Sequence, residues 1–178
     1  MNTSDERLAR AAAQGDAAAF ACLLERHYDR VFRLAFRLTG AVAEAEDLTQ
    51  DICAALPARL VGFRGEAPFA TWLWRVVVNA AHDRRRRAAA QARRAEGWGD
   101  WERQRRAADA EAAEALGWLA QALCRLPDTL RDTLALVLDE ATHAEAAEVL
   151  GVSAGTVSWR ISEARKRLRA MREKEDQR

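Results

Sequence analysis

Apolar residues recur every three or four positions along most of this chain, which is the spacing of helices that bury one face. The pattern predicts a first long helix from Asp16, whose carboxylate suits an N-cap, to about Leu38, with a break at Gly40. A second helix is expected from about Ala43, and Pro57 is expected to end or kink it. The chain therefore begins with helices in tandem.

Residues 63–68 read as a loop, and Pro68 suits the first turn of a helix that we extend from Phe69 to about Arg87. Residues 88–110 carry no sustained apolar stripe, so we expect a basic, flexible and partly helical linker. The apolar period returns from Glu111, and Pro127 opens another helix. The pattern thus predicts an all-α protein in which two small helical domains, residues 1–87 and 111–178, are joined by the linker at 88–110.

The most specific local pattern lies at residues 142–166, where a short Ala-rich helix is followed by a turn at Gly151 and a second helix capped by Ser153. Val157, Ile161, Ala164 and Leu168 form one apolar stripe on the second helix, and its other faces are polar. This is the pattern of a helix-turn-helix, whose second helix can lie in the major groove of DNA. A helical hairpin with a solvated basic face remains the alternative for this segment alone.

Composition narrows the function classes. The chain has only three prolines and nine glycines, which favours helices, and no apolar run long enough to span a membrane. Three scattered cysteines are expected to be free thiols in a reducing cytoplasm. We found no metal-ligand spacing and no HExxH, GxSxG or phosphate-binding glycine motif. The sequence therefore predicts no metal, no cofactor, no enzymatic activity and no membrane insertion.

The net charge of +1 conceals strong patterning. Residues 38–58 contain four acidic residues and no basic one, whereas residues 84–106 contain nine arginines and three acidic residues. Residues 158–172 contain six basic residues and one acidic residue, an excess that suits phosphate contacts. An acidic helix beside two basic segments indicates more than one charged partner.

Ordered motifs in this chain resemble those of the sigma-70 family. The stretch AEDLTQD at 45–51 and the block FRGE at 63–66, FATWLWR at 69–75 and VNA at 78–80 resemble region two of that family. The C-terminal stretch GTVSWRISEARKRLR at 155–169 is similar to region four. Nothing between them looks like region three, and this architecture resembles the group-four, or extracytoplasmic-function, bacterial sigma factors.

The resemblance implies partners and site residues. Binding to the clamp helices of core RNA polymerase is implied for Glu46, Asp47, Gln50 and Asp51, and the polymerase flap is the second expected contact. Minus-ten DNA binding is implied for Phe63, Arg64, Trp72, Arg75, Val76, Asn79 and Arg84. Minus-thirty-five DNA binding is implied for Ser153, Thr156, Ser158, Trp159, Arg160, Ser162, Arg165 and Lys166. Promoter DNA, an anti-sigma factor and a role in stress-responsive transcription complete the expectation.

Capture of an unpaired base requires an apolar wall, an amide that bonds the base edge and a positive charge for the backbone. Phe63 or Val76, Asn79 and Arg75 are the candidates for these roles. Core packing is an equally good interpretation of Trp72 and the preferred one for Phe69.

Some positions depart from the family pattern. Ser158 stands where a basic residue is common and Trp159 where a small one is common, so no promoter sequence is transferred from relatives. Trp98 and Trp101 are unusual in a linker and are candidates for docking onto a domain or partner. A two-domain helix-turn-helix regulator that acts without polymerase explains the C-terminal half equally well, but it leaves the acidic motif and the Asn79 block unexplained.

Overall fold

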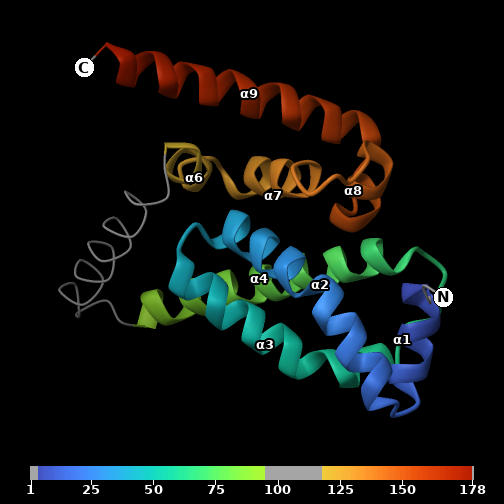
Figure 1. Ribbon diagram of the computed structural model, residues 1–178. Helices are drawn as coiled ribbons and strands as arrows, with labels where there is room; N and C mark the ends of the chain where they lie inside the picture. The colour runs from blue at the N-terminus through green and yellow to red at the C-terminus, as the bar shows by residue number, and fades with distance from the viewer. Residues whose placement is uncertain (1–3, 95–117, 178) are drawn as a thin grey trace.

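The computed structural model describes residues 4–94 and 118–177. Within these residues the regular structure is entirely helical, which confirms the all-α prediction for this part of the chain. In Figure 1, α9 lies over a row formed by α6, α7 and α8, and that row lies over α2 and α4. The helices are α1 (Asp5–Ala13), α2 (Ala17–Thr39), α3 (Val42–Leu60), α4 (Phe69–Arg94), α6 (Trp118–Cys124), α7 (Asp128–Val137), α8 (His143–Leu150) and α9 (Ala154–Asp176).

The ends of α2 follow the sequence prediction. The carboxylate of Asp16 accepts hydrogen bonds from the backbone N–H groups of Ala18 and Ala19 at 2.9 and 3.0 Å. At the other end Gly40 adopts a left-handed conformation with φ of 81° and its N–H bonds the carbonyl of Phe36. The N-cap and the glycine stop therefore both act as their residue types suggest.

Two helices extend further than predicted. Helix α3 continues through Pro57 to Leu60, so the proline does not end it. Helix α4 extends beyond Arg87 to Arg94, since residues 88–94 consist of Ala, Arg and Gln, which are strong helix formers. The remaining linker residues, with Trp98 and Trp101, lie outside the described residues, as do residues 111–117.

Helices α1 to α4 share an apolar core. Leu23, Leu34, Leu48, Phe69 and Leu73 are each at most 2% exposed and belong to one cluster of buried side chains. Helix α1, which the apolar pattern did not indicate, is held against α2 by Asp5, whose carboxylate pairs with Arg26 and His27 at 2.7 and 2.8 Å.

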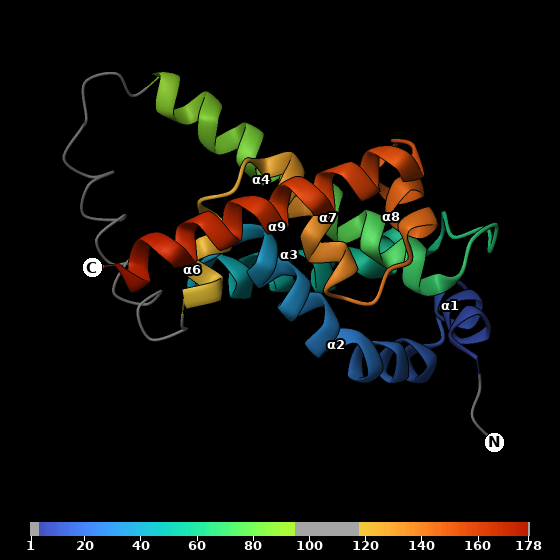
Figure 2. The same ribbon diagram turned by 90° about the horizontal axis from the view of Figure 1, so that it is seen from above.

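The C-terminal half contains the predicted helix-turn-helix. Thr142 and Glu145 form a capping box at the start of α8, Gly151 closes it with φ of 64°, and the hydroxyl of Ser153 accepts a hydrogen bond from the N–H of Thr156 at the start of α9. Of the apolar stripe predicted for α9, Val157, Ile161 and Ala164 are buried and Leu168 is half-buried. Seen from above in Figure 2, α9 crosses over α6, α7 and α8.

The two halves are not separate bodies, because α7 is packed on both sides. Leu130 and Leu134 belong to a cluster with Ala164 of α9, whereas Ala135 and Leu136 belong to the cluster that fills the N-terminal half. Residues 130–136 of α7 are all buried. The expected two domains thus share a continuous core in this structure.

A second interdomain contact lies where α6 approaches the C-terminal end of α2. A Cβ atom placed on Gly40 would lie only 1.9 Å from Sγ of Cys124. The glycine is therefore required both by the left-handed backbone and by the closeness of α6.

This contact generates a stability prediction. The Gly40→Ala variant should lose roughly 1–2 kcal/mol of unfolding free energy from the left-handed backbone, and a further roughly 1–3 kcal/mol from the overpacked contact with Cys124. Urea unfolding monitored by circular dichroism measures the difference.

Gly151→Ala is the matched control, because Gly151 also has a positive φ but has no atom within 4 Å of the added Cβ. Adding Cys124→Ala to the Gly40→Ala variant should recover the steric part of the loss. Equal destabilisation by the two glycine substitutions, with no recovery, would contradict the interdomain contact.

Candidate nucleic-acid and protein interfaces

The residues predicted to bind polymerase lie together on α3 and are open to solvent. Glu46, Asp47, Gln50 and Asp51 are all exposed, and their spacing places them on one helical face. Arg84 of α4 pairs with Asp47 at 3.1 Å and with Asp51 at 3.6 Å. The structure thus joins a residue predicted to contact DNA to two predicted to contact polymerase.

A pocket of about 260 Å³ lies beside the loop that connects α3 to α4. Residues 62–67 of the loop line it together with Trp72, Arg75 and Glu148. Phe63 packs edge-on against Trp72, with ring centroids 5.4 Å apart, and Phe69 lies beneath both rings at 5.7 and 5.6 Å. An aromatic wall and a guanidinium therefore face one small cavity, the combination that stacks and holds a nucleotide base.

Of the other predicted minus-ten residues, Arg64 lines this pocket, whereas Val76, Asn79 and Arg84 do not. Asn79 is exposed and lies one turn beyond Arg75 on α4, and the side chain of Arg64 is 82% exposed. Val76 is only 6% exposed, because it lies on the same face of α4 as Phe69 and Leu73 and packs into the core. Of the two proposed apolar walls, Phe63 lines the cavity and Val76 does not.

Glu148 of α8 was not identified from the sequence, and it comes from the other half of the chain. Its carboxylate accepts a hydrogen bond from Arg75 at 2.8 Å, with the two side chains 49% and 42% exposed. The positive charge of Arg75, which would suit a DNA phosphate, is therefore paired with the carboxylate of Glu148 in this structure.

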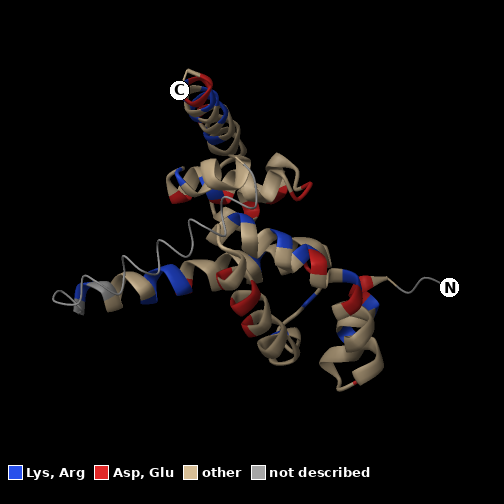
Figure 3. Cartoon of the chain, turned by 60° about the vertical axis from the view of Figure 1, so that its left-hand side comes forward, with Lys and Arg blue, Asp and Glu red and all other residues tan. Residues whose placement is uncertain are grey.

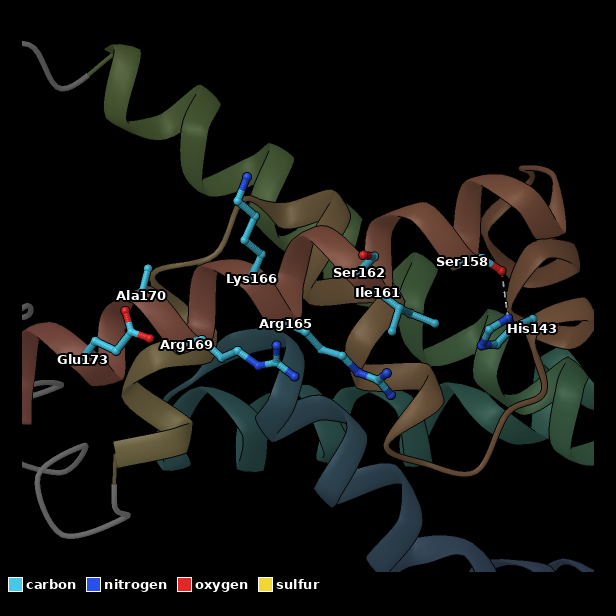
Figure 4. Close-up of a pocket in the computed structure, with 9 residues that line it drawn as sticks. All are labelled: His143, Ser158, Ile161, Ser162, Arg165, Lys166, Arg169, Ala170 and Glu173. Carbon is cyan, nitrogen blue, oxygen red and sulfur yellow. Dashed lines mark hydrogen bonds between the residues drawn. The ribbon is translucent and has the colours of Figure 1, made fainter.

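Helix α9 presents different residues on its two flanks. A groove of about 730 Å³ runs along it. His143 and Ser158 line one end, with Nδ1 of His143 3.0 Å from Oγ of Ser158, and Ser162 and Arg165 line it further along. Figure 4 shows Arg165 and Arg169 pointing to one side of the helix and Lys166 to the other. The groove is open and largely basic.

Four predicted minus-thirty-five residues do not line this groove: Ser153, Thr156, Trp159 and Arg160. Trp159 is 63% exposed, whereas Arg160 is half-buried and is not among the groove residues. Ser153 and Thr156 bond each other at the start of α9, so both have a structural role as caps. The residues predicted to bind the minus-thirty-five element therefore fall into three groups. Ser153 and Thr156 cap α9, Arg160 is half-buried, and the others are exposed.

The carboxylate of Glu145 accepts the hydrogen bonds that cap the first turn of α8. Hydrogen bonds from the hydroxyl and the backbone N–H of Thr142 hold the pKa of Glu145 below its ordinary value. A lowered folded-state pKa means that this stabilisation is present at neutral pH and is lost as the pH falls through the lowered value. The helix-turn-helix is thus fully capped under physiological conditions.

Basic residues gather along the C-terminal turns of α4, which project from the body of the molecule (Figure 3). Across residues 4–94 and 118–177, no group of His, Cys, Asp and Glu is arranged to hold a metal ion. In the same part of the chain, every helix is too short or too polar to cross a membrane.

Comparison with family models identifies both halves. Residues 23–91 match the model of Sigma-70 region 2, and residues 110–168 match that of Sigma-70, region 4. The first match contains α3 and the aromatic pocket, and the second contains the helix-turn-helix.

Named relatives match over nearly the whole chain. The chain is 38% identical to the ECF RNA polymerase sigma factor SigM of Mycobacterium tuberculosis, over 93% of this chain and 83% of the relative. It is 29% identical to the ECF RNA polymerase sigma factor SigW of Bacillus subtilis, over 88% and 90%. Among solved structures, CnrH in complex with the cytosolic domain of CnrY matches with a TM-score of 0.69 and 30% identity, over 96% of this chain and 98% of that one.

Proposed function

The chain belongs to the sigma-70 family, among its extracytoplasmic-function RNA polymerase sigma factors, and on that premise we propose which of its surfaces bind polymerase and promoter DNA. The observation that carries the proposal is that an acidic face, an aromatic pocket and a basic recognition helix occur in the two matched regions. The regulator that acts without polymerase leaves the match of residues 23–91 to Sigma-70 region 2 unexplained.

The exposed face of α3 is the proposed contact with the clamp helices of core polymerase. Exposed carboxylates need little desolvation and attract a basic surface at long range, which suits a reversible protein partner. The C-terminal half is proposed to meet the polymerase flap, so that the polymerase fixes the spacing between the two DNA-binding regions.

The pocket beside the α3–α4 loop is the proposed site for an unpaired base of the minus-ten element. Phe63 and Trp72 supply the stacking wall, Arg75 supplies charge for the backbone, and Asn79 supplies an amide for the base edge. Val76 supports this site from within the core rather than touching DNA.

Helix α9 is the proposed reader of the minus-thirty-five element. Ser158, Trp159 and Ser162 lie on its exposed face, with Lys166 beyond them, and the N-terminal turns of a recognition helix are the part that reaches base edges. Arg165 and Arg169 are placed to hold phosphates from one side of the groove.

An anti-sigma factor is the proposed regulator, because the solved structure of CnrH is of a complex with the cytosolic domain of CnrY. We propose further that the chain acts in the cytoplasm, where polymerase and promoter DNA are found, and that it binds these partners without catalysing a reaction of its own.

Binding to polymerase is tested by a charge reversal on α3. The Glu46→Lys variant should bind core polymerase about tenfold more weakly, because a pair worth roughly 1 kcal/mol is replaced by repulsion. Glu46 is the better position than Asp47 or Asp51, since reversing either of those would also repel Arg84. Competition binding to core polymerase gives the affinity, and gel shifts with and without core polymerase should show promoter binding only with it.

Glu25→Lys is the matched control, because it makes the same charge change on an exposed position of α2. If the isolated chain bound duplex promoter DNA with nanomolar affinity and both variants bound polymerase normally, the proposal would fail.

Asn79→Ala should impair promoter opening more than initial binding. A side-chain amide that pairs with a base edge contributes roughly 1–3 kcal/mol of discrimination. Permanganate reactivity of the minus-ten thymines should fall at similar occupancy of the promoter by the holoenzyme. Gln91→Ala, which removes an exposed amide further along α4, should leave reactivity unchanged. Normal melting by the Asn79 variant would place base capture elsewhere.

Lys166→Ala should weaken binding of the holoenzyme to all minus-thirty-five sequences alike and reduce the slope of log affinity against log salt by about one. Arg167→Ala is the control, because Arg167 pairs with Glu163 of the same helix at 2.7 Å and its charge is already compensated. A larger loss of slope for Arg167 than for Lys166 would show that the other flank of α9 faces DNA.

A further inference from the structure

Helix α1 lies before residues 23–91, the segment that matches Sigma-70 region 2, so that match does not account for its side chains. Its apolar side belongs to the N-terminal core, where Ala9 is fully buried and Leu8 packs against the same cluster. In Figures 1 and 2 the helix lies beside the loop that leads into α4. This position brings its polar side chains close to the loop that lines the aromatic pocket.

The first turn of α1 is fixed on α2. The carboxylate of Asp5 accepts a hydrogen bond from Nη1 of Arg26 at 2.7 Å and lies 2.8 Å from Nε2 of His27. The His27 ring packs against the ring of Phe69, with the two centroids 5.1 Å apart. Because Phe69 lies beneath the aromatic wall of the pocket, α1 is connected through α2 to that wall.

Glu6 supplies a cap that the chain immediately before α4 lacks. Helix α4 begins at Phe69, and the side chains of the two preceding residues, Ala67 and Pro68, cannot accept a hydrogen bond. Oε1 of Glu6 instead accepts a hydrogen bond from the backbone N–H of Phe69 at 3.3 Å. Hydrogen bonds from its own backbone N–H and from that of Phe69 hold the pKa of Glu6 below its ordinary value. The cap is therefore charged at neutral pH, which the dipole of α4 also favours.

Arg10 lies one turn after Glu6 on α1 and contacts the loop itself. A Cβ atom placed on Gly65 would lie 3.1 Å from Nη2 of Arg10, so the guanidinium packs directly on this residue. Gly65 has a left-handed φ of 72° and lines the pocket. The two contacts of α1 therefore fall at Gly65 and Phe69, on either side of residues 66–68.

The turn of α4 that Glu6 caps is also the turn that positions Trp72. The backbone N–H of Trp72 bonds the carbonyl of Pro68 at 3.1 Å, which places the indole one turn into the helix. Trp72 lines the pocket and packs on Phe63. The cap on α4 thus also supports the stacking wall.

We propose that α1 preforms the minus-ten pocket, with Glu6 and Arg10 as positioning residues that hold residues 65–69 in the shape that accepts an unpaired base. This inference rests on the proposed role of the pocket in base capture. Glu6 and Arg10 act through the backbone of the loop and do not touch DNA. A loop that contains Gly62 and Gly65 is costly to order, so a support that orders it in advance lowers the cost of binding a base.

Abasic oligonucleotides separate base capture from backbone binding. The probe is a fluorescent single-stranded oligonucleotide with the minus-ten strand of a promoter that the holoenzyme transcribes. A matched set lacks the base at one position at a time. For the parent holoenzyme, affinity should fall most where the captured base is missing, so the ratio of intact to abasic affinity at that position measures the pocket alone.

Glu6→Ala should lower this ratio about fivefold, the fold-change that corresponds to a lost helix cap. Arg10→Ala should lower it in the same direction, whereas Glu6→Gln keeps an oxygen acceptor and should restore most of the ratio. Arg7→Ala is the matched control, because it removes the same charge from an exposed position one turn earlier on α1. If Glu6→Ala melts below the assay temperature, Arg10→Ala carries the test, since it changes an exposed side chain.

The possible outcomes are distinct. An unchanged ratio in both the Glu6→Ala and Arg10→Ala holoenzymes overturns the positioning role of α1. An equal loss of affinity for intact and abasic oligonucleotides, with a smaller salt slope, makes Arg10 a phosphate contact and overturns that role as well. A parent holoenzyme for which no missing base matters contradicts base capture by the pocket, and that failure of the proposed function is recognised without any variant.

Discussion

A buried carboxylate is costly unless hydrogen-bond donors lie close to it. The side chains that donate to the carboxylate of Asp139 all come from the other half of the chain. That requirement fixes how the turn after α7 sits on α2, and it brings Trp74 of α4 to the same point. With the turn in place, α7 lies between the two buried clusters and α8 reaches the mouth of the aromatic pocket. Asp139 thus adds a directional, hydrogen-bonded contact to the apolar core that the two halves share.

In this structure the surface proposed to bind polymerase and the pocket proposed to bind DNA differ in their accessibility. Glu46 and Gln50 point into solvent, so a protein partner can meet α3 without any rearrangement. Arg75 and the pocket beside it carry a residue of the other half. The surface proposed to meet polymerase is therefore exposed in this structure, whereas the pocket proposed to meet DNA is lined in part by a residue of the C-terminal half.

Local features were predictable because they depend on neighbouring residues. Asp16, Gly40, Gly151 and Ser153 act as helix caps as their types suggest, and the apolar stripe of α9 was evident from its period. Pro57 does not end its helix, which continues for three more residues to Leu60. The pocket was only partly predictable, since nothing in the local sequence distinguishes an outward Trp72 from an inward Val76.

The contacts between the halves were not predictable from local pattern. Asp139 and Arg30 are 109 residues apart, and neither residue type is expected to be buried. The available signal was the spacing of the four arginines on α2, which places them on one face of that helix. A basic face on a helix is usually solvated, so the pattern alone favoured exposure.

The composition of α7 has a consequence for the separated state. Its side toward α9 is built from Leu130 and Leu134, whereas its side toward the N-terminal half mixes Ala135 and Leu136 with the charged Asp132. A surface of small and charged residues is tolerated by water, while one of large apolar residues promotes self-association. Leu136 is nonetheless fully buried, so parting the halves would expose a large apolar side chain, and the shared core opposes their separation.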